Sequence, residues 1–451
     1  MTRLTLPVAF LALALPASHA ADWPQWMGPN RDDVWAETGI VKAFPAGGLK
    51  PTWTAAIGAG YSGPAVAGGR VYVLDRVLAK GAANPEDPFD TKQKVNSTER
   101  VLCFDAKDGK ELWKREYECP YQISYPAGPR CTPTVSGGKV YSLGAMGDLI
   151  CLDAVTGDVV WAKNFVKDYG AKVPVWGFCG HPLVYKQALV CVVGGDKATA
   201  VAFDKETGKE LWKALEAREP GYCPPTLIHA GGVDQVLIWH AQALNSLDPL
   251  TGKVYWKVDL EPMYGMSIMA PRQSGDLLFA GGIGACAVLK LDRDKPGASV
   301  VWNEAVDKAG AKAKARGLYP VNMTPLIEGG TIYGVDQPGM LRAVELTTGK
   351  KLWFTHKPVI GKEEEEAFKG SGSGTAFVVK NGDRHFLFSE TGDLIIARLT
   401  PKGYEELSRT HLLDPTGAAF GRKVLWTHPA FANKSVYIRN DKELACFSLA
   451  E

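Results

Sequence analysis

Paired cysteines are missing from this 451-residue chain, although it contains nine cysteines. No two of them are adjacent and no CxxC pair occurs, so the spacing that is typical of structural zinc sites is absent. We therefore expect no metal; Cys131, Cys179, His181 and Cys223 are the candidate ligands if one binds. A Cys119–Cys131 disulfide is compatible with the sequence. The pairing of Cys119, Cys131, Cys179 and Cys223 stays open, and the odd total of nine leaves at least one thiol unpaired.

An excess of charge and a long apolar segment are also missing. The 51 basic and 49 acidic residues give a net charge of +2 without a basic block, which disfavours nucleic acid as a partner. The one apolar run, Leu4–Leu15, follows Arg3 and precedes small residues near Ala20, as in a cleaved signal peptide. It is too short to span a bilayer. No cysteine follows the cleavage point, so we expect no lipid anchor, no membrane span and a periplasmic or secreted protein.

The chain instead contains a repeated twelve-residue phrase in which a carboxylate stands four residues before a glycine and eight before a tryptophan. Alternating residues before the carboxylate predict a strand, and the Asp can accept hydrogen bonds from the amides of a turn. The glycine supplies positive φ, and the tryptophan can fill the gap to a neighbouring unit. The copies are Asp105, Gly109, Trp113; Asp153, Gly157, Trp161; Asp204, Gly208, Trp212; Asp248, Gly252, Trp256; and Glu345, Gly349, Trp353.

A second hairpin signature precedes each phrase, most clearly at Pro64–Tyr72, Pro133–Tyr141 and Pro325–Tyr333. Two hairpins per unit make a four-stranded blade, and eight such starts predict an all-β, eight-bladed β-propeller of antiparallel blades. The last unit lacks its fourth strand. We expect the N-terminal segment around Trp53 to supply it and close the ring. In the seventh unit Leu407 stands where the tryptophan is expected.

These patterns divide the chain into three parts. Residues 1–20 form the signal peptide, residues 21–48 an N-terminal extension, and residues 49–451 a single propeller domain. Length alone favours two or three domains, but the repeat places all blades in one ring.

The phrase resembles the tryptophan-docking motif, small-x-Asp-x-x-x-Gly-x-x-x-Trp, of the pyrroloquinoline-quinone-like (PQQ-like) eight-bladed propellers. The resemblance covers nearly the whole mature chain and is specific for the fold. Within that family the chain looks like the BamB-like envelope proteins, the propeller subunits of outer-membrane β-barrel assembly. Its opening, Asp22–Arg31 followed by Glu37–Gly39, is similar to a secreted bacterial branch. The missing lipid-anchor cysteine departs from the BamB lipoprotein pattern.

The same resemblance implies an enzymatic alternative. Quinoprotein dehydrogenases of this fold hold PQQ at the channel mouth with an adjacent-cysteine disulfide, a tryptophan floor, a calcium ion bound by Glu and Asn, and an Asp base. This chain has no adjacent cysteines. Trp176 is the candidate floor, and Asp148 or Asp336 the candidate base. We expect no cofactor and assign no catalytic residue; PQQ and calcium belong only to this alternative.

The long connections predict a partner-binding face, because in a propeller the links between blades and those between second and third strands share one face. Aromatic and Arg side chains there are typical anchors for a partner. The candidates are Trp176, His181, Trp239, His240, Trp426, His428 and Arg439. We therefore predict a monomeric binding or scaffold protein with a protein or envelope-polymer partner. The alternatives are a PQQ-dependent alcohol or sugar dehydrogenase and a polysaccharide-binding or polysaccharide-active module.

Overall fold

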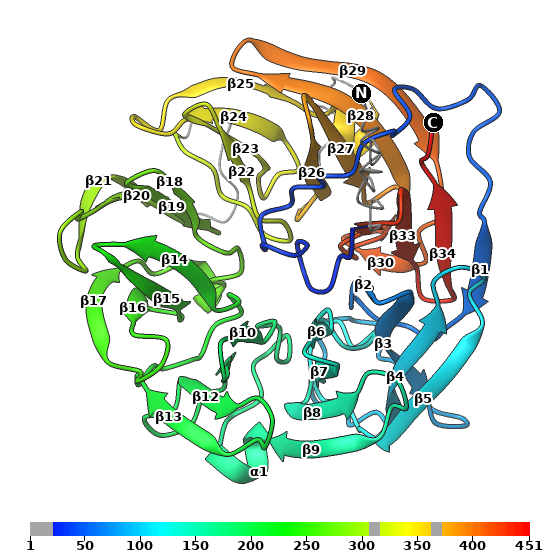
Figure 1. Cartoon of the computed structure of the whole chain (residues 1–451), viewed down its shortest axis with the longest axis horizontal. Helices are drawn as coiled ribbons and strands as arrows, with labels where there is room; N and C mark the ends of the chain where they lie inside the picture. The colour runs from blue at the N-terminus through cyan, green and yellow to red at the C-terminus, as the bar shows by residue number, and fades with distance from the viewer. Residues whose placement is uncertain (1–20, 306–315, 362–371) are drawn as a thin grey trace, which may run out of the picture.

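The strands of the propeller are arranged as a ring of blades around a central axis (Figure 1). The structure is a computed structural model that describes residues 21–305, 316–361 and 372–451. Over these residues the chain forms eight four-stranded antiparallel sheets and one two-stranded hairpin. This confirms the predicted eight-bladed, all-β propeller. The signal peptide predicted for residues 1–20 lies outside the described residues, and the predicted domain boundaries stay a prediction.

The first four blades follow one another without a break in strand order. Blade 1 contains β2 (Ala65–Ala67), β3 (Arg70–Leu78), β4 (Ser97–Asp105) and β5 (Glu111–Glu118), and blade 2 contains β6 (Thr134–Ser136), β7 (Lys139–Leu143), β8 (Asp148–Asp153) and β9 (Val159–Asn164). Blade 3 contains β10 (Leu183–Tyr185), β11 (Ala188–Val192), β12 (Ala200–Asp204) and β13 (Glu210–Ala214), and blade 4 contains β14 (Thr226–Ala230), β15 (Val233–Trp239), β16 (Ala243–Leu247) and β17 (Val254–Asp259).

The remaining blades include the closure. Blade 5 contains β18 (Arg272–Ser274), β19 (Leu277–Gly282), β20 (Ala285–Leu291) and β21 (Ala298–Ala305), and blade 6 contains β22 (Leu326–Glu328), β23 (Thr331–Val335), β24 (Leu341–Glu345) and β25 (Lys351–Thr355). Blade 7 contains β26 (Ala376–Asn381), β27 (Arg384–Ser389), β28 (Asp393–Thr400) and β29 (Gly403–His411), and blade 8 contains β32 (Ala430–Ala432), β33 (Ser435–Arg439), β34 (Glu443–Ser448) and β1 (Trp53–Ala56).

Short elements occupy some of the connections. They are α1 (Phe165–Tyr169), α2 (Lys357–Ile360), the 3₁₀ turn η1 (Met263–Gly265) and the hairpin β30 (Gly417–Ala419) and β31 (Arg422–Val424). None of the helices in the described part of the chain has the length and apolar character that crossing a bilayer requires.

The ring closes through the two ends of the chain. Strand β1 pairs with β34 in antiparallel register, with Trp53 opposite Cys446 (Figure 1). Strand β1 thus becomes the outer strand of blade 8, as the sequence predicted. The pairing covers an edge of β34 that would otherwise expose unpaired backbone groups.

At five blade interfaces a tryptophan packs on the turn glycine of the next blade. A Cβ atom on Gly157 would lie 2.5 Å from the Trp113 ring, so only glycine allows this contact. The Trp113 indole also donates to the Ala154 carbonyl oxygen at 3.3 Å. Gly157 also has a φ of +72°, the left-handed conformation that the turn requires and that glycine adopts without steric cost. The same packing joins Trp53 to Gly109, Trp161 to Gly208, Trp212 to Gly252 and Trp302 to Gly349.

The other three interfaces depart from this pattern. After blade 6, the Trp353 indole donates to the Thr400 carbonyl oxygen at 2.8 Å, and nothing lies within 4 Å of the Cβ position of Gly403. The next blade after Trp256 has a stretched turn, and the Trp256 indole instead donates to Gln235 Oε1 at 2.9 Å within its own blade. In blade 7 the expectation for Leu407 was wrong by one residue. The docking tryptophans lie opposite the last residue before a β-bulge, and in blade 7 Ser408 holds that place, opposite Ile396. Its hydroxyl accepts from the Phe44 amide at 2.9 Å, so N-terminal chain occupies the junction.

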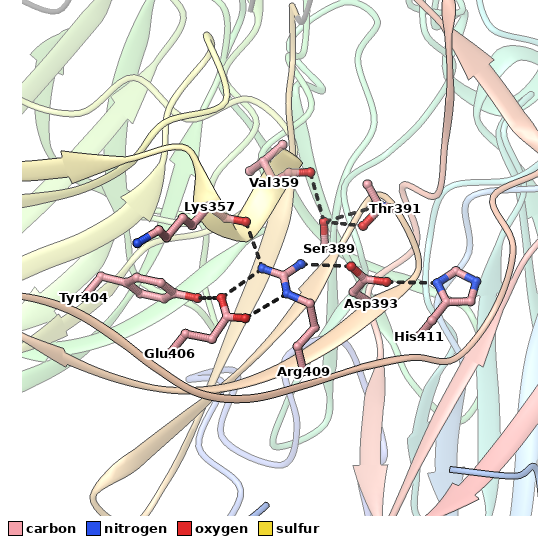
Figure 2. A network of polar contacts seen from close by, with 9 residues as sticks. All are labelled: Lys357, Val359, Ser389, Thr391, Asp393, Tyr404, Glu406, Arg409 and His411. Carbon is pink, nitrogen blue, oxygen red and sulfur yellow. Dashed lines mark hydrogen bonds and ion pairs between the residues drawn. The ribbon is translucent and has the colours of Figure 1, made fainter. Parts of the chain in front are cut away.

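A polar network fastens blade 7 to the connection that precedes it (Figure 2). Arg409 on β29 bonds to Asp393 at 2.9 Å, to Glu406 at 2.9 Å and to the Lys357 carbonyl oxygen at 2.9 Å. His411 extends the network with its Nδ1 atom 2.9 Å from Asp393.

This network predicts a pH-dependent contribution to stability. Partial burial opposes protonation of His411, but hydrogen bonds to Asp393 and Asp414 outweigh it and raise the pKa of His411. A histidine whose pKa is raised by folding stabilises the folded state fully when the pH is below its unfolded pKa of about 6.5. This stabilisation is lost as the pH rises through the folded pKa. We expect His411→Gln to lower the urea midpoint at about pH 5.5 more than at about pH 8.5. Equal losses at both pH values would contradict the prediction.

Candidate functional site

A cavity of about 710 Å³ opens on the face where the blades are connected. Every inter-blade connection contributes to its wall, so it is coaxial with the ring. Its lining is rich in aromatic residues and methionine, which is typical of sites for apolar ligands. The aromatic and methionine residues are Trp26, Tyr61, Phe89, Tyr125, Trp176, Tyr222, Tyr264, Met266, Met269, Met323, Phe377, Phe420 and Trp426.

The floor of this cavity comes from the N-terminal extension. Trp26 lines the cavity and stacks on His181, with ring centroids 4.7 Å apart and planes at 9°. Its edge also meets the His428 ring, 6.2 Å away. The indole therefore lies between the connections that lead into blades 3 and 8.

The extension enters and leaves the channel on the opposite face, where the tight turns lie. Asp22 accepts from the Gly68 amide at the turn between β2 and β3, at 3.2 Å. Asn381, at the end of β26, donates to the Trp35 carbonyl oxygen at 2.9 Å. Figure 1 shows this N-terminal trace crossing the centre of the ring. The segment plugs the channel from one side, so the cavity is open only toward the loop face.

Buried charges hold the plug between these ends. The Arg31 guanidinium donates to the carbonyl oxygens of Pro182 and of Pro225, the latter at 3.2 Å. Arg272 donates to the Arg31 carbonyl oxygen at 2.8 Å. The Asp33 carboxylate also lies 3.1 Å from the Nε2 atom of His428. The segment is thus locked by backbone acceptors that only the folded ring presents together.

The histidine beneath the plug is neutral. Burial, together with the positive charges of Arg31 and His428, holds the pKa of His181 well below its usual range. Its Nδ1 atom accepts from the Thr132 amide at 2.9 Å, so the proton resides on the other ring nitrogen.

The wall carries one permanent charge. Arg130 lines the cavity, and its guanidinium lies 5.1 Å from the Tyr61 ring centroid and donates to the Tyr125 carbonyl oxygen at 2.7 Å. Within residues 21–305, 316–361 and 372–451, no aspartate or glutamate lines the cavity. Arg130 therefore places a positive charge in the wall of the cavity.

The predicted partner-binding residues divide into two groups. Trp176, His181, Trp426 and His428 line the cavity, as does Cys179.

The second group does not reach the cavity. Trp239 is fully buried, and its indole donates to the Leu260 carbonyl oxygen at 2.9 Å. His240 is buried beside it in sequence. Arg439 is also fully buried and donates to the Leu74 carbonyl oxygen at 2.7 Å. These three side chains tie blades and connections together and present nothing to a partner.

The two candidate bases lie apart from the cavity. Asp148 accepts from the Asn164 side chain at 2.8 Å at the start of β8, and burial raises its pKa. Asp336 is buried 2.5 Å from the Arg342 guanidinium. Burial raises the pKa of Asp336 to about 7, with Arg342 opposing the shift. Neither carboxylate lines the cavity that Trp176 lines.

The candidate metal ligands do not form a cluster. All nine cysteines belong to the described residues and none forms a disulfide there, so the Cys119–Cys131 bridge that the sequence allows is not formed. Cys131 and Cys223 pack into separate hydrophobic clusters, and burial raises the pKa of both thiols. Across the described ranges no group of three or more His, Cys, Asp or Glu side chains is placed to hold a metal ion.

Sequence reasoning missed the residues at the two ends of the cavity. Trp26 was assigned to an extension outside the fold, although the aromatic pair at 23 and 26 and the basic Arg31 in that extension were available as signals. The rim residues Phe89, Tyr264 and Phe420 lie in connections without a repeat pattern, so no periodicity indicated them.

Comparisons with known proteins agree with this geometry. A family model described as outer membrane protein assembly factor BamB matches residues 97–231 and 240–451. The outer membrane protein assembly factor BamB of Shewanella oneidensis is 24% identical over 242 residues, which cover 50% of this chain and 56% of that protein. The chain thus spans just over half the length of this relative. An alcohol dehydrogenase (quinone) subunit of Komagataeibacter europaeus is 34% identical over 132 residues, 27% of this chain and 18% of that protein.

Solved structures show the same fold. The crystal structure of BamB from Moraxella catarrhalis has a TM-score of 0.51 at 16% identity, over 83% of this chain and 98% of that one. A europium-containing methanol dehydrogenase has a TM-score of 0.61 at 12% identity, over 95% and 98% of the two chains. The family model covers well over half of the sequence. The chain therefore belongs to the family described as outer membrane protein assembly factor BamB.

Proposed function

We propose that the chain is a binding protein of the bacterial envelope that holds a protein partner on its loop face. The observation that carries this proposal is the cavity at the channel mouth. All eight inter-blade connections line it, seven of them with aromatic or methionine side chains, and Trp26 closes it from behind. Large aromatic residues in such a depression are the usual anchors of protein interfaces. The role of the BamB relatives as outer membrane protein assembly factors supports an envelope location and a protein partner.

The same residues fit the dehydrogenase alternative poorly. Trp26 and Trp176 could stack on a planar cofactor. A calcium ion, however, requires several oxygen ligands, mostly carboxylates, and no Asp or Glu among the described residues lines the cavity. Asp148 and Asp336, the candidate bases, do not line it either. We therefore derive no catalytic step and place this function second.

The proposal is tested by cross-linking capture from envelope extract. We expect the double variant Trp176→Ala and Trp426→Ala to reduce capture of the partner by about tenfold or more, because both indoles line the cavity. The control is Val160→Ser, which changes an exposed apolar residue on the outer strand β9 and should leave capture intact. Equal capture by the double variant and the control, with unchanged thermal unfolding of both, would refute the proposal.

A further inference from the structure

Three aromatic side chains stand at the rim of the cavity without cover. Phe89, Tyr264 and Phe420 line it while remaining 50%, 63% and 46% exposed. They come from three separate connections: the link between β3 and β4, the link between β17 and β18, and the tip of the β30–β31 hairpin. Exposed aromatic residues gathered at one opening mark a surface that is covered by something else.

The backbone is strained at two of these residues and at Tyr125, which packs against the third, Phe89. Tyr125, Tyr264 and Phe420 have φ values of 51°, 60° and 49°, in the left-handed region that bulky residues disfavour. All three line the same cavity. Such strain persists where the surrounding structure fixes it and is concentrated at functional sites. Here it directs large rings toward a single opening.

The wall between these rings is apolar and adaptable. Met266, Met269 and Met323 line it together with Ile268 and Ile283. Methionine side chains are flexible and polarisable, and they accommodate apolar groups of different shape. This part of the wall therefore favours contact with hydrophobic side chains.

Arg130 adds a positive charge to this apolar wall and so favours a ligand that also carries a negative charge. The Arg130 guanidinium bonds to the carbonyl oxygens of Ser124 and Tyr125, at 2.9 and 2.7 Å, and so stands directly behind the aromatic group formed by Tyr125, Phe89 and Phe420. Within the described ranges Arg130 has no carboxylate in ion-pair contact. A cation beside aromatic rings, in a cavity without acidic residues, is complementary to an anion that carries an apolar group.

We propose that this cavity binds an extended polypeptide segment in which a large aromatic or aliphatic side chain stands next to a carboxylate. The apolar side chain enters among the rim rings and the methionines, and the carboxylate faces Arg130. This inference rests on the proposed function and names the chemistry that the loop face recognises in its partner. The adaptable wall makes recognition depend on residue class rather than on one sequence.

The test uses two synthetic nine-residue peptides and the full chain. Both peptides contain two phenylalanines in an otherwise serine background; they differ in one central residue, aspartate or asparagine. Titration calorimetry should show the aspartate peptide binding about tenfold more tightly, and Arg130→Gln should abolish that difference. Phe420→Asn and Tyr264→Asn should weaken both peptides about tenfold, since asparagine tolerates the left-handed backbone. Val160→Ser, on the outer strand, should change neither affinity.

Four results would overturn the inference. The first is equal affinity for the two peptides, and the second is unchanged binding by both rim variants; neither depends on Arg130→Gln folding. The third is equally tight binding of N-acetylphenylalanine alone, which would point to a small aromatic acid instead of a polypeptide. Partner capture that is lost in the Trp176 and Trp426 variant while peptides fail to bind would overturn this inference and leave the proposed function standing.

Discussion

Replacing Trp53 with alanine is expected to lower the free energy of unfolding by about 3–5 kcal/mol, the usual cost of truncating a buried tryptophan. Trp53 is buried between blades 8 and 1, packs on Gly109 and donates to the Ala106 carbonyl oxygen at 3.0 Å. It also belongs to the strand that closes the ring. The loss should appear in urea unfolding followed by circular dichroism.

The matched control is Thr54→Ala on the same strand. Thr54 is exposed, although it pairs with Ala445 in the same register. Its substitution should change stability by no more than about 0.5 kcal/mol. If both variants unfold at the same urea concentration, Trp53 does not hold the closure.

The second large effect is expected for Gly157→Ala. A left-handed φ costs an alanine about 1–2 kcal/mol, and the added methyl group would also overlap the Trp113 ring, for a further cost of about 1–3 kcal/mol. Gly138 provides a close control, because its φ of +74° nearly equals the +72° of Gly157 while nothing lies within 4 Å of its Cβ position.

The comparison separates the two causes. Gly138→Ala should show only the conformational cost, so the difference between the two variants in urea unfolding measures the packing of Trp113 against the next blade. A Gly157→Ala loss no larger than that of Gly138→Ala would mean that the tryptophan contact is readily displaced.

The ring could be predicted from the sequence because each docking unit is local. Asp, Gly and Trp occupy fixed positions within twelve residues, and each has one physical task that no other residue type performs as well. The closing strand could be predicted in the same way: the segment around Trp53 had no blade before it, and the last unit lacked its fourth strand. Prediction from spacing failed at Leu407, because Gly403 pairs with Thr400 in a different hairpin turn, so counting from this glycine does not reach the position opposite Ile396.

The cavity was only partly predictable for the opposite reason. Its residues come from eight connections and an extension, and their proximity depends on the closed ring. Trp176, Trp426, His181 and His428 were identified as candidate residues because connections share a face. Trp239 and Arg439 met the same criterion, but their side chains turn into the ring, where backbone carbonyl oxygens receive them. Residue type could not distinguish the two cases.

Blade 8 combines three strands from the end of the chain with one from near its start. During synthesis, blades 1 to 7 need only neighbours that have just been made, so each can dock soon after it emerges. Strand β1 must instead wait for β34 and leaves the first blade with an open side for almost the whole of translation. A nascent chain held in this state is most exposed to pairing with other molecules just before its last residues appear. Completion of the ring therefore depends on a single late pairing, between β1 and β34.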